Sequence, residues 1–569
     1  MKFIYMFLAL LVFNAGANSQ WSIDPSENLK VASGGISPQI CTDGNGGAYI
    51  AWETGAPPNR RLLRIQRLDR YGFKQFPEKS LPIRTGEFDQ ANLMLFEDGV
   101  GGAIVVFNEL LPVADTLKAI AYAQHIDSAG TRVWGDSAVV ISESPAHQIP
   151  LAACGDGSGG AFVFWSEDRN QNGAEELYGN RIDATGNRFL TDDGVLIVES
   201  TVDIEADAVN SNGPIVSFNK DNKILIQKFT KELAPVWADE VDAGLPFRSA
   251  FRKMFSDGSG GVVLSNKEQT FFDNEPFFKL WAQRLDGNGI PMWNEGIALV
   301  DSVSEPSRVP EIEKTYENIF FAWSDNRNGS RLIYAQLVTL EGDVNWQRSG
   351  IPVSLIPSIK GTPQVVADKS NGIIVVFGDT REPMPGIYGQ RVSASGDRLW
   401  STDDVLISGR PDAGRGRQMT PDGSGGAIVT WYEIGTGTGN GIFAQQISRE
   451  GKLGDVVVSV RENEETDIPS SFRLFQSYPN PFNPSMTIKY HIPEFSYVTL
   501  KIFDLTGKEV ITLVHKKQGR GVHQISWNGK DEKGGDVASG VYIYRLQAGN
   551  SSTRAAHTFV QSRKAVFLK

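Results

Sequence analysis

One loop of the sequence carries oxygen-bearing side chains at the spacing of a calcium site. From Asp168 the chain reads D-R-N-Q-N-G, and a carboxylate follows at the ninth position. Oxygen ligands on alternate residues around a glycine-containing turn suit Ca²⁺, which takes six to eight oxygens. The candidate ligands are Asp168, Asn170, Asn172 and Glu176. The alternative is a polar loop with Asn-Gly turn chemistry, and a bound ion would stiffen the loop without taking part in catalysis.

Acidic and basic side chains also recur in pairs. The pairs occupy matching places in the chain: Asp168/Arg169, Asp325/Arg327 and Asp379/Arg381. A group that recurs in a repeat belongs to its scaffold, so we interpret these residues as ion pairs that tie loops to neighbouring units. The alternative is a cluster of substrate-binding arginines. Pairing of charges alone does not separate the two interpretations, because structural ion pairs and functional sites perturb charged groups in similar ways. A sialidase-type site would also need a tyrosine nucleophile and a carboxylate, and the sequence selects no such pair.

Histidine is scarce, with six residues in the chain. His125 stands where other repeats carry an arginine, such as Arg181 or Arg284. We therefore expect a surface strand residue there and not a catalytic base. A zinc site or a Ser-His-Asp triad has almost nothing to be built from. The sequence assigns no catalytic residue, favours a role other than catalysis, and indicates no cofactor except the calcium ion.

These residues lie within a repeat that returns about every 55 residues. Its marker is an amide side chain that recurs in a strand-like segment: Gln66, Gln124, Asn180, Gln227, Gln283, Gln336, Gln390 and Gln445. A glycine-rich turn such as Asp156-Gly157 precedes most of these amides, and runs such as residues 161–165 are apolar on both alternations. Such runs are typical of strands buried on both faces. A fixed period of this kind marks a repeat architecture.

Each unit supplies about four short strands separated by turns. Four-stranded sheets that stack around an axis bury both faces and leave only short edges. The sequence therefore predicts an all-β fold, with an eight-bladed β-propeller over residues 20–460. Seven blades are the alternative if the eroded unit at 213–240 is not a full blade. Residues 21–33 resemble the last strand of a unit, and we expect them to complete the final blade.

The first 19 residues predict a signal peptide. Lys2 precedes an apolar run over 3–13, and small residues follow at 15–19. The run is shorter than the ~20 apolar residues that a membrane span needs. We expect a mature protein without a transmembrane span, located outside the cell or on the outer-membrane surface. Cys41 and Cys154 lie in non-adjacent repeats, so we expect free buried thiols.

Charge divides the chain. The formal net charge is -12, which disfavours a nucleic-acid partner because phosphate binding relies on a basic surface. Residues 461–470 are polar and without periodicity, as in a linker. Residues 471–569 contain 14 Lys and Arg against 6 Asp and Glu, a net charge of +8 that leaves -20 on the rest. Short alternating strands in this last segment predict a β-sandwich.

Four segments of the last domain carry a family resemblance: 478–484, 502–510, 527–531 and 538–544. They resemble the C-terminal sorting domain (type A) of type IX secretion substrates, and also the Ig-like module of the flagellar hook-capping protein. The resemblance implies export by the type IX secretion machinery. It places an export motif at Tyr478, Pro479, Asn480, Pro481, Phe482, Trp527, Gly540 and Tyr542. The alternative is an accessory sandwich with no export role, since fold does not fix function.

We therefore expect a secreted or cell-surface propeller that binds a macromolecular ligand, a surface glycan or a protein, at its rim or central opening. The alternative is an extracellular carbohydrate-active enzyme, a sialidase-like glycoside hydrolase or a lyase, that uses the central cleft. An enzyme should show unrepeated carboxylates and arginines that converge at one mouth of the ring. A binding protein should show a broad polar or aromatic surface.

Overall fold

The computed structural model describes residues 19–454 and 472–567, apart from gaps at 56–59, 78–79, 87, 114–115, 202–205, 211–212, 222, 247–251, 273–274, 304–309, 316–317, 411–414, 435–439, 476, 478–479, 481, 483–484, 493–495, 519–520, 534 and 550–558. The predicted signal peptide, except Ser19, and the predicted linker at 461–470 lie outside the described residues. The chain separates into two compact units, Met1–Val457 and Val458–Lys569.

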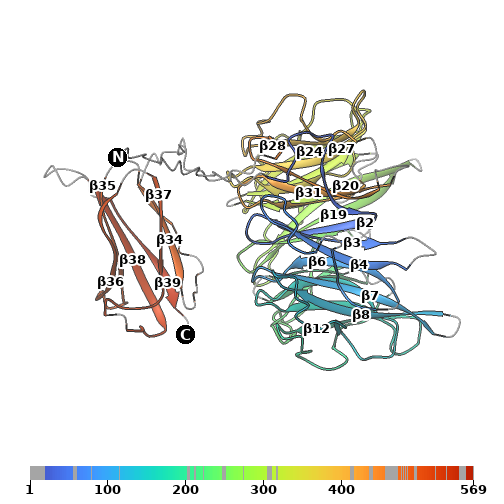
Figure 1. The fold of residues 1–569 in the computed structure, drawn as a ribbon, viewed down its shortest axis with the longest axis horizontal. Coiled ribbons are helices and arrows are strands. Elements are labelled where there is room, and N and C mark those ends of the chain that lie inside the picture. Colours follow the sequence, from blue (N-terminus) through green and yellow to red (C-terminus); the bar gives the residue numbers. More distant parts are fainter. Residues whose placement is uncertain are drawn as a thin grey trace, which may run out of the picture. The chain divides into compact units, whose positions relative to one another are not determined.

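The first unit is a β-propeller, and its described residues form eight four-stranded sheets (Figure 1). Blade 1 consists of β2 (Ile36–Thr42), β3 (Ala48–Thr54), β4 (Leu62–Leu68) and β5 (Leu81–Pro82). Blade 2 consists of β6 (Asp89–Glu97), β7 (Ala103–Val113), β8 (Thr116–Ile126) and β9 (Val139–Val140). Blade 3 consists of β10 (Ile149–Gly155), β11 (Ala161–Glu167), β12 (Glu175–Ile182) and β13 (Val195–Thr201). Blade 4 consists of β14 (Ala206–Asn210), β15 (Pro214–Lys220), β16 (Lys223–Lys228) and β17 (Val241–Asp242).

The remaining blades repeat this pattern. Blade 5 consists of β18 (Arg252–Ser256), β19 (Val262–Phe272), β20 (Glu275–Leu285) and β21 (Ile297–Val303). Blade 6 consists of β22 (Glu311–Lys314), β23 (Asn318–Asp325), β24 (Leu332–Thr339) and β25 (Ile351–Pro352). Blade 7 consists of β26 (Gln364–Ala367), β27 (Ile373–Asp379), β28 (Gly386–Val392) and β29 (Val405–Ser408). Blade 8 joins β30 (Arg415–Pro421), β31 (Ala427–Glu433) and β32 (Gly441–Ile447) to β1 (Leu29–Ser33) from the start of the chain.

The ring closes through both ends of the propeller sequence. The innermost strands of successive blades contact one another in order, and β30 of blade 8 contacts β2 of blade 1. β1 pairs antiparallel with β32, with Leu29 opposite Ala444. Trp21 donates its indole N–H to the Arg70 carbonyl of blade 1 at 2.9 Å. The predictions of eight blades and of a closing N-terminal strand are therefore confirmed.

The repeated amides hold the turn between the third and fourth strands. Gln283, for example, accepts hydrogen bonds from the backbone N–H groups of Arg284 and Trp293 at 2.9 and 3.2 Å. Its Nε2 donates to the Asn294 carbonyl at 3.1 Å. The tryptophan so placed donates its own N–H to Leu340 of the next blade at 3.2 Å. A buried polar group is costly unless it is bonded, so the amide fixes a turn that then fastens one blade to another.

Antiparallel pairing gives the propeller two faces. The loops between second and third strands, together with the connections that enter each blade, lie on what we call the hairpin face. The glycine-rich turns between first and second strands, together with the loops between third and fourth strands, lie on the opposite turn face. The hairpins β7–β8 and β19–β20 have eleven residues in each strand, and the first clearly projects from the ring (Figure 1).

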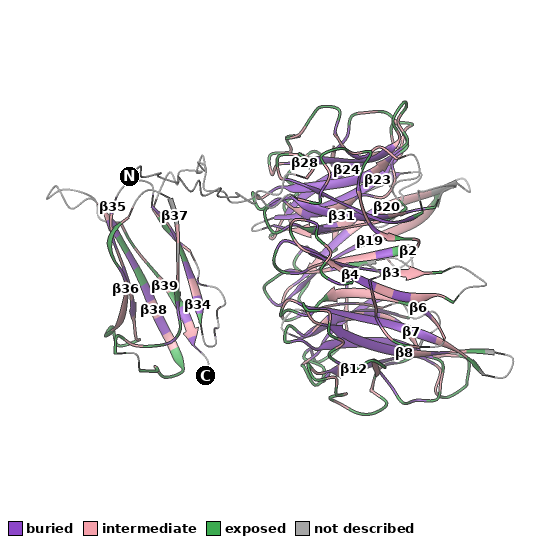
Figure 2. Cartoon of the chain, viewed as in Figure 1, coloured by how far each residue is buried: buried purple, intermediate pink, exposed green. Residues whose placement is uncertain are grey.

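The core lies between the blades, where strands are apolar on both sides. The strand β11 is buried at all seven positions, as the sequence pattern predicted, and Figure 2 shows buried segments along the strands of the blades. Cys41 and Cys154 are both free thiols, as expected, but only Cys154 is buried and Cys41 is partly exposed, so the expectation of burial is wrong for Cys41. Burial raises the pKa of Cys154. No helix in the described part of the chain has the length and apolar character that a membrane span requires.

The second unit is a β-sandwich. One sheet has the order β33 (Arg473–Leu474), β34 (Met486–Ile492) and β37 (Gly521–Trp527). The other has the order β36 (Glu509–Gln518), β35 (Ser496–Phe503), β38 (Gly540–Gly549) and β39 (Phe559–Phe567). β34 and β35 alternate between buried and more exposed positions, as expected for sheets with one buried face.

Candidate functional site

A clasp between a carboxylate and a cation recurs on the turn face. In blade 3, Asp156 Oδ1 accepts the backbone N–H groups of Ser158 and Gly160, and Oδ2 lies 2.7 Å from Arg181 Nη2. Burial raises the pKa of Asp156, but the bonds from Arg181 and the turn outweigh it and leave that pKa below its ordinary value. Matching contacts occur elsewhere in the ring: Arg67–Asp43, His125–Asp98, Arg284–Asp257 and Arg391–Asp368. In blade 8 the neutral amide of Gln446 takes the place of the cation and donates to Asp422. The clasp belongs to the scaffold.

The expectation of a surface position for His125 is wrong. The residue is 6% exposed, and Nε2 lies 2.7 Å from Asp98 Oδ2. His125 is buried because of its position in the blade. The residue after the repeated amide on the third strand faces the carboxylate of the glycine-rich turn of the same blade, and this contact recurs around the ring. An imidazole in the place of arginine is drawn to the same buried partner. His125 is therefore a structural residue of the clasp.

The acidic and basic pairs on the hairpin face are ion pairs, as predicted, with two corrections. Arg327 contacts Asp325 and Arg381 contacts Asp379 within their own blades, so these contacts do not tie a loop to a neighbouring blade. Arg169 bonds Glu167 at 2.9 Å, and not Asp168. Glu167, at the end of the second strand, points inward and meets Arg169, whereas the side chain of the next residue, Asp168, points outward.

Each of these arginines also lies over a tyrosine of the third strand. The guanidinium carbons of Arg169, Arg327 and Arg381 lie 3.6, 3.9 and 3.8 Å from the ring centres of Tyr178, Tyr334 and Tyr388. Such cation–π contact adds to the attraction of the carboxylate. The recurrence of the same three-part contact marks it as scaffold.

Three of the predicted calcium ligands, Asp168, Asn170 and Asn172, lie in the loop between β11 and β12, and the fourth, Glu176, lies at the start of β12. Asp168 accepts the backbone N–H groups of Asn172 and Gly173 at 3.2 and 2.9 Å. Asn170 donates through Nδ2 to Glu176 Oε1 at 2.7 Å. In this arrangement the oxygens serve bonds within the loop, and calcium would require Asn170 to present its oxygen instead of its nitrogen. Among the described residues no group of three His, Cys, Asp or Glu is placed to hold a metal ion, and calcium stays a prediction.

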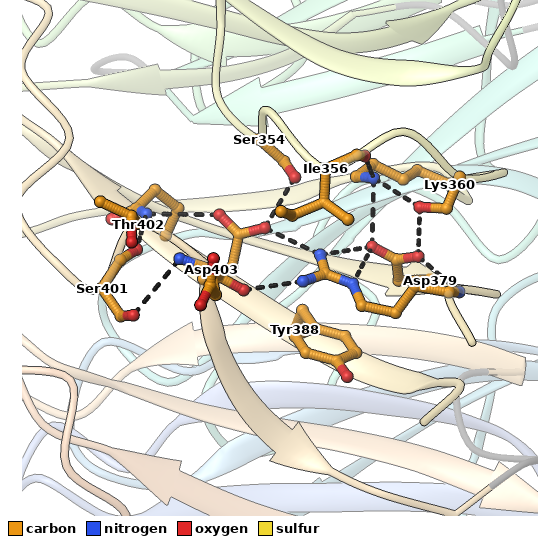
Figure 3. Close-up of polar contacts among 12 residues, drawn as sticks. Ser354, Ile356, Lys360, Asp379, Tyr388, Ser401, Thr402 and Asp403 are labelled. Atoms are coloured by element: carbon orange, nitrogen blue, oxygen red, sulfur yellow. Dashed lines mark hydrogen bonds and ion pairs between the residues drawn. The ribbon is translucent and has the colours of Figure 1, made fainter. Parts of the chain in front are cut away.

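Blade 7 departs from the repeat at a buried lysine. Lys360 takes the place that glutamine has in blades 2 and 3, where Gln90 and Gln148 enter the blade. Its side chain is fully buried, and Nζ lies 3.1 Å from Asp379 Oδ2 (Figure 3). The ammonium also donates to the Ile356 carbonyl at 2.5 Å and to Ser358 Oγ at 2.7 Å. Burial lowers the pKa of Lys360, although Asp379 opposes that shift.

The same network reaches the outer strand of blade 7. Arg381 Nη2 lies 2.8 Å from Asp404 Oδ2, and Arg398 Nη2 lies 3.3 Å from Asp404 Oδ1. Ser354, which leaves blade 6, donates to Asp404 Oδ2 at 2.6 Å. Charge-assisted bonds of this kind are stronger than neutral ones. The connection from blade 6 to blade 7 is thereby fixed to two loops of blade 7.

That fixed connection presents apolar side chains to solvent. Leu355 and Ile359 are 56% and 62% exposed, and the loops of blades 7 and 8 add Met384 and Ile434. We call these four residues the hairpin-face patch. Ile359 lies beside blade 7, because its carbonyl accepts the backbone N–H of Thr380 at 3.1 Å. All four residues lie in connections of the hairpin face between blades 6 and 8, and this makes that face a candidate interaction surface.

Repetition separates this patch from other exposed apolar residues. On the turn face, the loop between the third and fourth strands contains a residue that forms an isolated β-bridge with the end of the third strand. In five blades the residue directly after it is an exposed apolar one: Val133, Phe189, Val236, Met292 and Leu399. The residues of the hairpin-face patch have no such periodic place. Leu117 and Phe271 near the ends of the two long hairpins are also exposed. A feature that breaks the repeat is the better candidate for function.

The sandwich core is organised around an aromatic group. The ring centre of Phe482 lies 4.8 Å from that of Phe567 and 5.4 Å from that of Trp527, and Trp527 lies 5.2 Å from Tyr542. Asn480 joins the last strand, since its Oδ1 accepts the Val566 N–H at 2.7 Å. Residues far apart in sequence thus close one end of the sandwich.

Residues 484–552 match the FlgD Ig-like domain. This match confirms the predicted resemblance to an Ig-like module, and it covers part of the second unit. Within that Ig-like domain, Trp527 and Tyr542 pack in the aromatic group, and Gly540 begins β38. Phe482 and Asn480 lie just before the matched range. Tyr478, Pro479 and Pro481 of the predicted export motif lie outside the described residues.

Other comparisons give distant likenesses. No curated protein matches the chain. Among solved structures, the chain is similar to a thermostable family-43 glycoside hydrolase, at 13% identity over 46% of this chain and 95% of the other, with a TM-score of 0.24. It is also similar to the Penicillium chrysogenum alpha-L-arabinanase complexed with arabinobiose, at 11% identity over 74% and 98%, with a TM-score of 0.29. A Pyrococcus horikoshii acylaminoacyl peptidase matches at 10% identity and a TM-score of 0.37, over 82% of this chain and 59% of the peptidase. These likenesses do not bear on activity.

Proposed function

We propose that this protein is an exported propeller that binds a macromolecular ligand on its hairpin face. The observation that carries the proposal is the hairpin-face patch, whose apolar side chains are exposed outside the repeat pattern. Two of them, Leu355 and Ile359, lie on a connection held by buried ion pairs. A surface that is already ordered loses less conformational entropy when a ligand binds. The aliphatic character of Leu355, Ile359 and Ile434 favours a protein ligand over a glycan.

A carbohydrate-active enzyme is the alternative function. Such an enzyme would hold an acidic substrate with arginines at the mouth of the ring. Arg169, Arg327 and Arg381 are instead engaged by carboxylates of their own blades and lie against tyrosines. Releasing them would break contacts that recur as scaffold. Ligand binding therefore accounts better for the side chains on this face.

Photo-crosslinking tests where the ligand binds. A photoreactive amino acid at Ile359 should form crosslinks when the full chain is mixed with the envelope fraction of the producing cells. The matched control carries the same amino acid at Val133, which is also exposed but lies on the turn face. Crosslinks from residue 359 alone would support the proposal. Equal crosslinking from both positions would contradict it.

The second part of the proposal is that the Ig-like domain serves export through the type IX machinery, as the resemblance over 471–569 implies. The proposed location is outside the cell or on the outer-membrane surface. The test compares cells that express the full chain with cells whose chain ends at Ser470, and follows the propeller in periplasm, envelope and medium. Retention of the shortened chain in the periplasm would support an export role. Equal release of both chains would refute it.

A further inference from the structure

The outer face of the smaller sheet of the sandwich gathers basic side chains. Leu474 and Tyr490 point into the core and are buried, so strand alternation turns Arg473, Lys489 and His491 outward. Arg473 of β33 stands directly opposite His491 of β34, and Lys489 is the next outward residue along β34. Arg473 and Lys489 are exposed. The strand register therefore places two permanent cations as neighbours on one face.

An aromatic ring lies among these groups. The guanidinium carbon of Arg473 lies 4.9 Å from the ring centre of Phe475, and Nζ of Lys489 lies 5.6 Å from the same centre. The ring centre of His491 lies 4.5 Å from that of Phe475. The Phe475 backbone N–H donates to the Lys489 carbonyl at 3.0 Å, which fixes the ring beside β34. We call these four residues the basic face, and cation–π contact holds its cations in place.

A further cation lies at the edge of the basic face. Arg563 of β39 donates through Nε to the Leu474 carbonyl at 3.0 Å. The Leu474 backbone N–H donates in turn to Gln561 of β39 at 2.7 Å, so this edge is ordered. A guanidinium has five N–H donors, and Arg563 can therefore bond a ligand in addition. Cations thus extend from the smaller sheet to the edge strand of the larger one.

Carboxylates lie away from the basic face. The strands β33, β34 and β37 contain no Asp or Glu. The described carboxylates of this unit lie in the turn after β35, at the start of β36 and in the loop after β37: Asp504, Glu509, Asp531, Glu532 and Asp536. That loop follows Trp527, which pairs with Met486, about 17 Å along β34 from His491. Burial, Lys489 and Arg473 lower the pKa of His491, as expected beside positive charge that no near carboxylate offsets.

The kind of partner follows from what the basic face offers. The large apolar side chains that are exposed in the described part of this unit are Leu505 and Val560, and neither belongs to β33, β34 or β37. A protein interface relies on buried aromatic and apolar anchors, and binding to a bilayer surface relies on apolar side chains that enter it. A row of cations suits a polymer that carries anionic groups along its length.

We propose that the basic face binds a linear acidic polysaccharide, whose carboxylate or sulfate groups pair with Arg473 and Lys489 and continue to Arg563. A planar guanidinium bonds such groups through two parallel N–H donors. The site belongs to the sandwich alone, so it depends neither on the function proposed for the hairpin-face patch nor on the export role of this domain.

Binding of the full chain to immobilised polymers tests this proposal. The probes are heparin and alginate, with dextran as the uncharged control and with polyglutamate and phosphatidylglycerol vesicles as anions of other classes. The full chain has a formal net charge of -12, so general attraction to a polyanion is not expected. We expect heparin or alginate to bind and dextran not to bind. Raising the salt from about 50 to 200 mM should weaken binding roughly tenfold, as for about three cations that displace counterions.

The variant Arg473→Gln/Lys489→Gln should bind the polysaccharide at least about tenfold more weakly, because each lost bond to a charged group contributes more than about 1 kcal/mol. The matched control is Lys516→Gln/Lys517→Gln, which removes the same charge from exposed residues of β36, at the opposite edge of the larger sheet from β39. The control should bind like the unaltered chain, and unchanged melting temperatures show that both variants are folded. Equal losses in the two variants, equal binding to dextran, or binding to polyglutamate or vesicles but to neither polysaccharide would overturn the proposal.

Discussion

Replacing Asp379 by alanine should loosen the connection that carries the hairpin-face patch. The variant leaves the ammonium of Lys360 fully buried without its carboxylate. Breaking a buried pair by removing one partner costs roughly 3–5 kcal/mol. Each 1.4 kcal/mol is a factor of ten, so we expect local opening to become more frequent by about two to three orders of magnitude.

Hydrogen exchange measured by mass spectrometry over residues 353–363 reads this change directly. The amides of Lys360 and Gly361 donate to the Arg331 and Gly378 carbonyls at 3.0 Å, so their exchange reports opening of the connection. The control is Lys360→Gln, which restores the residue that blades 2 and 3 use at this place. It should have a much smaller effect. Acceleration below tenfold in Asp379→Ala, or equal effects of the two variants, would refute the reasoning.

Three further predictions concern the propeller. The pKa of Glu313 rises from 4.5 to about 8 on folding, so the folded protein keeps a proton that the unfolded chain releases, and the free energy of unfolding should fall between pH 4.5 and 8. Because Glu313 is partly exposed, Glu313→Gln should remove roughly 2 kcal/mol of that pH dependence in denaturant titrations, and an unchanged pH profile would refute this. Cys154, which is buried, should react with a thiol reagent at neutral pH only on unfolding, since burial raises the pKa of its thiol; rapid labelling of Cys154 in the native protein would count against it. Calcium at about 1 mM, a level that extracellular calcium sites bind, should slow hydrogen exchange over 168–176, and Asp168→Asn should abolish the effect; equal exchange with and without calcium would exclude the ion.

The architecture could be predicted from the sequence because the repeat determines it. Each sequence signal indicates one local structure. The glycine-rich turns separate strands, the runs that are apolar on both alternations are strands buried on both faces, and the amides at Gln66 and its equivalents mark each repeat. Eight such units close a ring, and residues 21–33 could be recognised as the closing segment because they resemble the last strand of a unit. The Ig-like domain was equally readable, since its motifs follow one another in order along the chain.

The details of side-chain pairing could not be predicted in the same way. The sequence places Asp168 next to Arg169, but strand alternation turns Glu167 inward and makes it the partner. His125 is buried for a related reason, because its partner Asp98 comes from the turn 27 residues earlier. Strand alternation hides the first contact, and distance along the chain hides the second.

The candidate site lay outside the repeat signal altogether. Lys360 differs from Gln90 and Gln148, and aligning the residues that enter each blade would have exposed that difference. Its importance depends on Asp379 and Asp404, which only the folded ring brings near. The exposure of Leu355 and Ile359 follows from that network, because the connection is held in place and the side chains around it point outward.

A binding isotherm tests the central claim most directly. The full chain is titrated onto the envelope fraction of the producing cells, with Ile359→Ser/Met384→Ser as the patch variant and Val133→Ser/Val236→Ser as the turn-face control. Loss of two anchoring side chains from the centre of an interface costs more than about 1 kcal/mol each, so the patch variant should bind at least about tenfold more weakly. The control should bind like the unaltered chain. Equal binding by the patch variant and the unaltered chain would contradict the claim that the hairpin face is the binding surface.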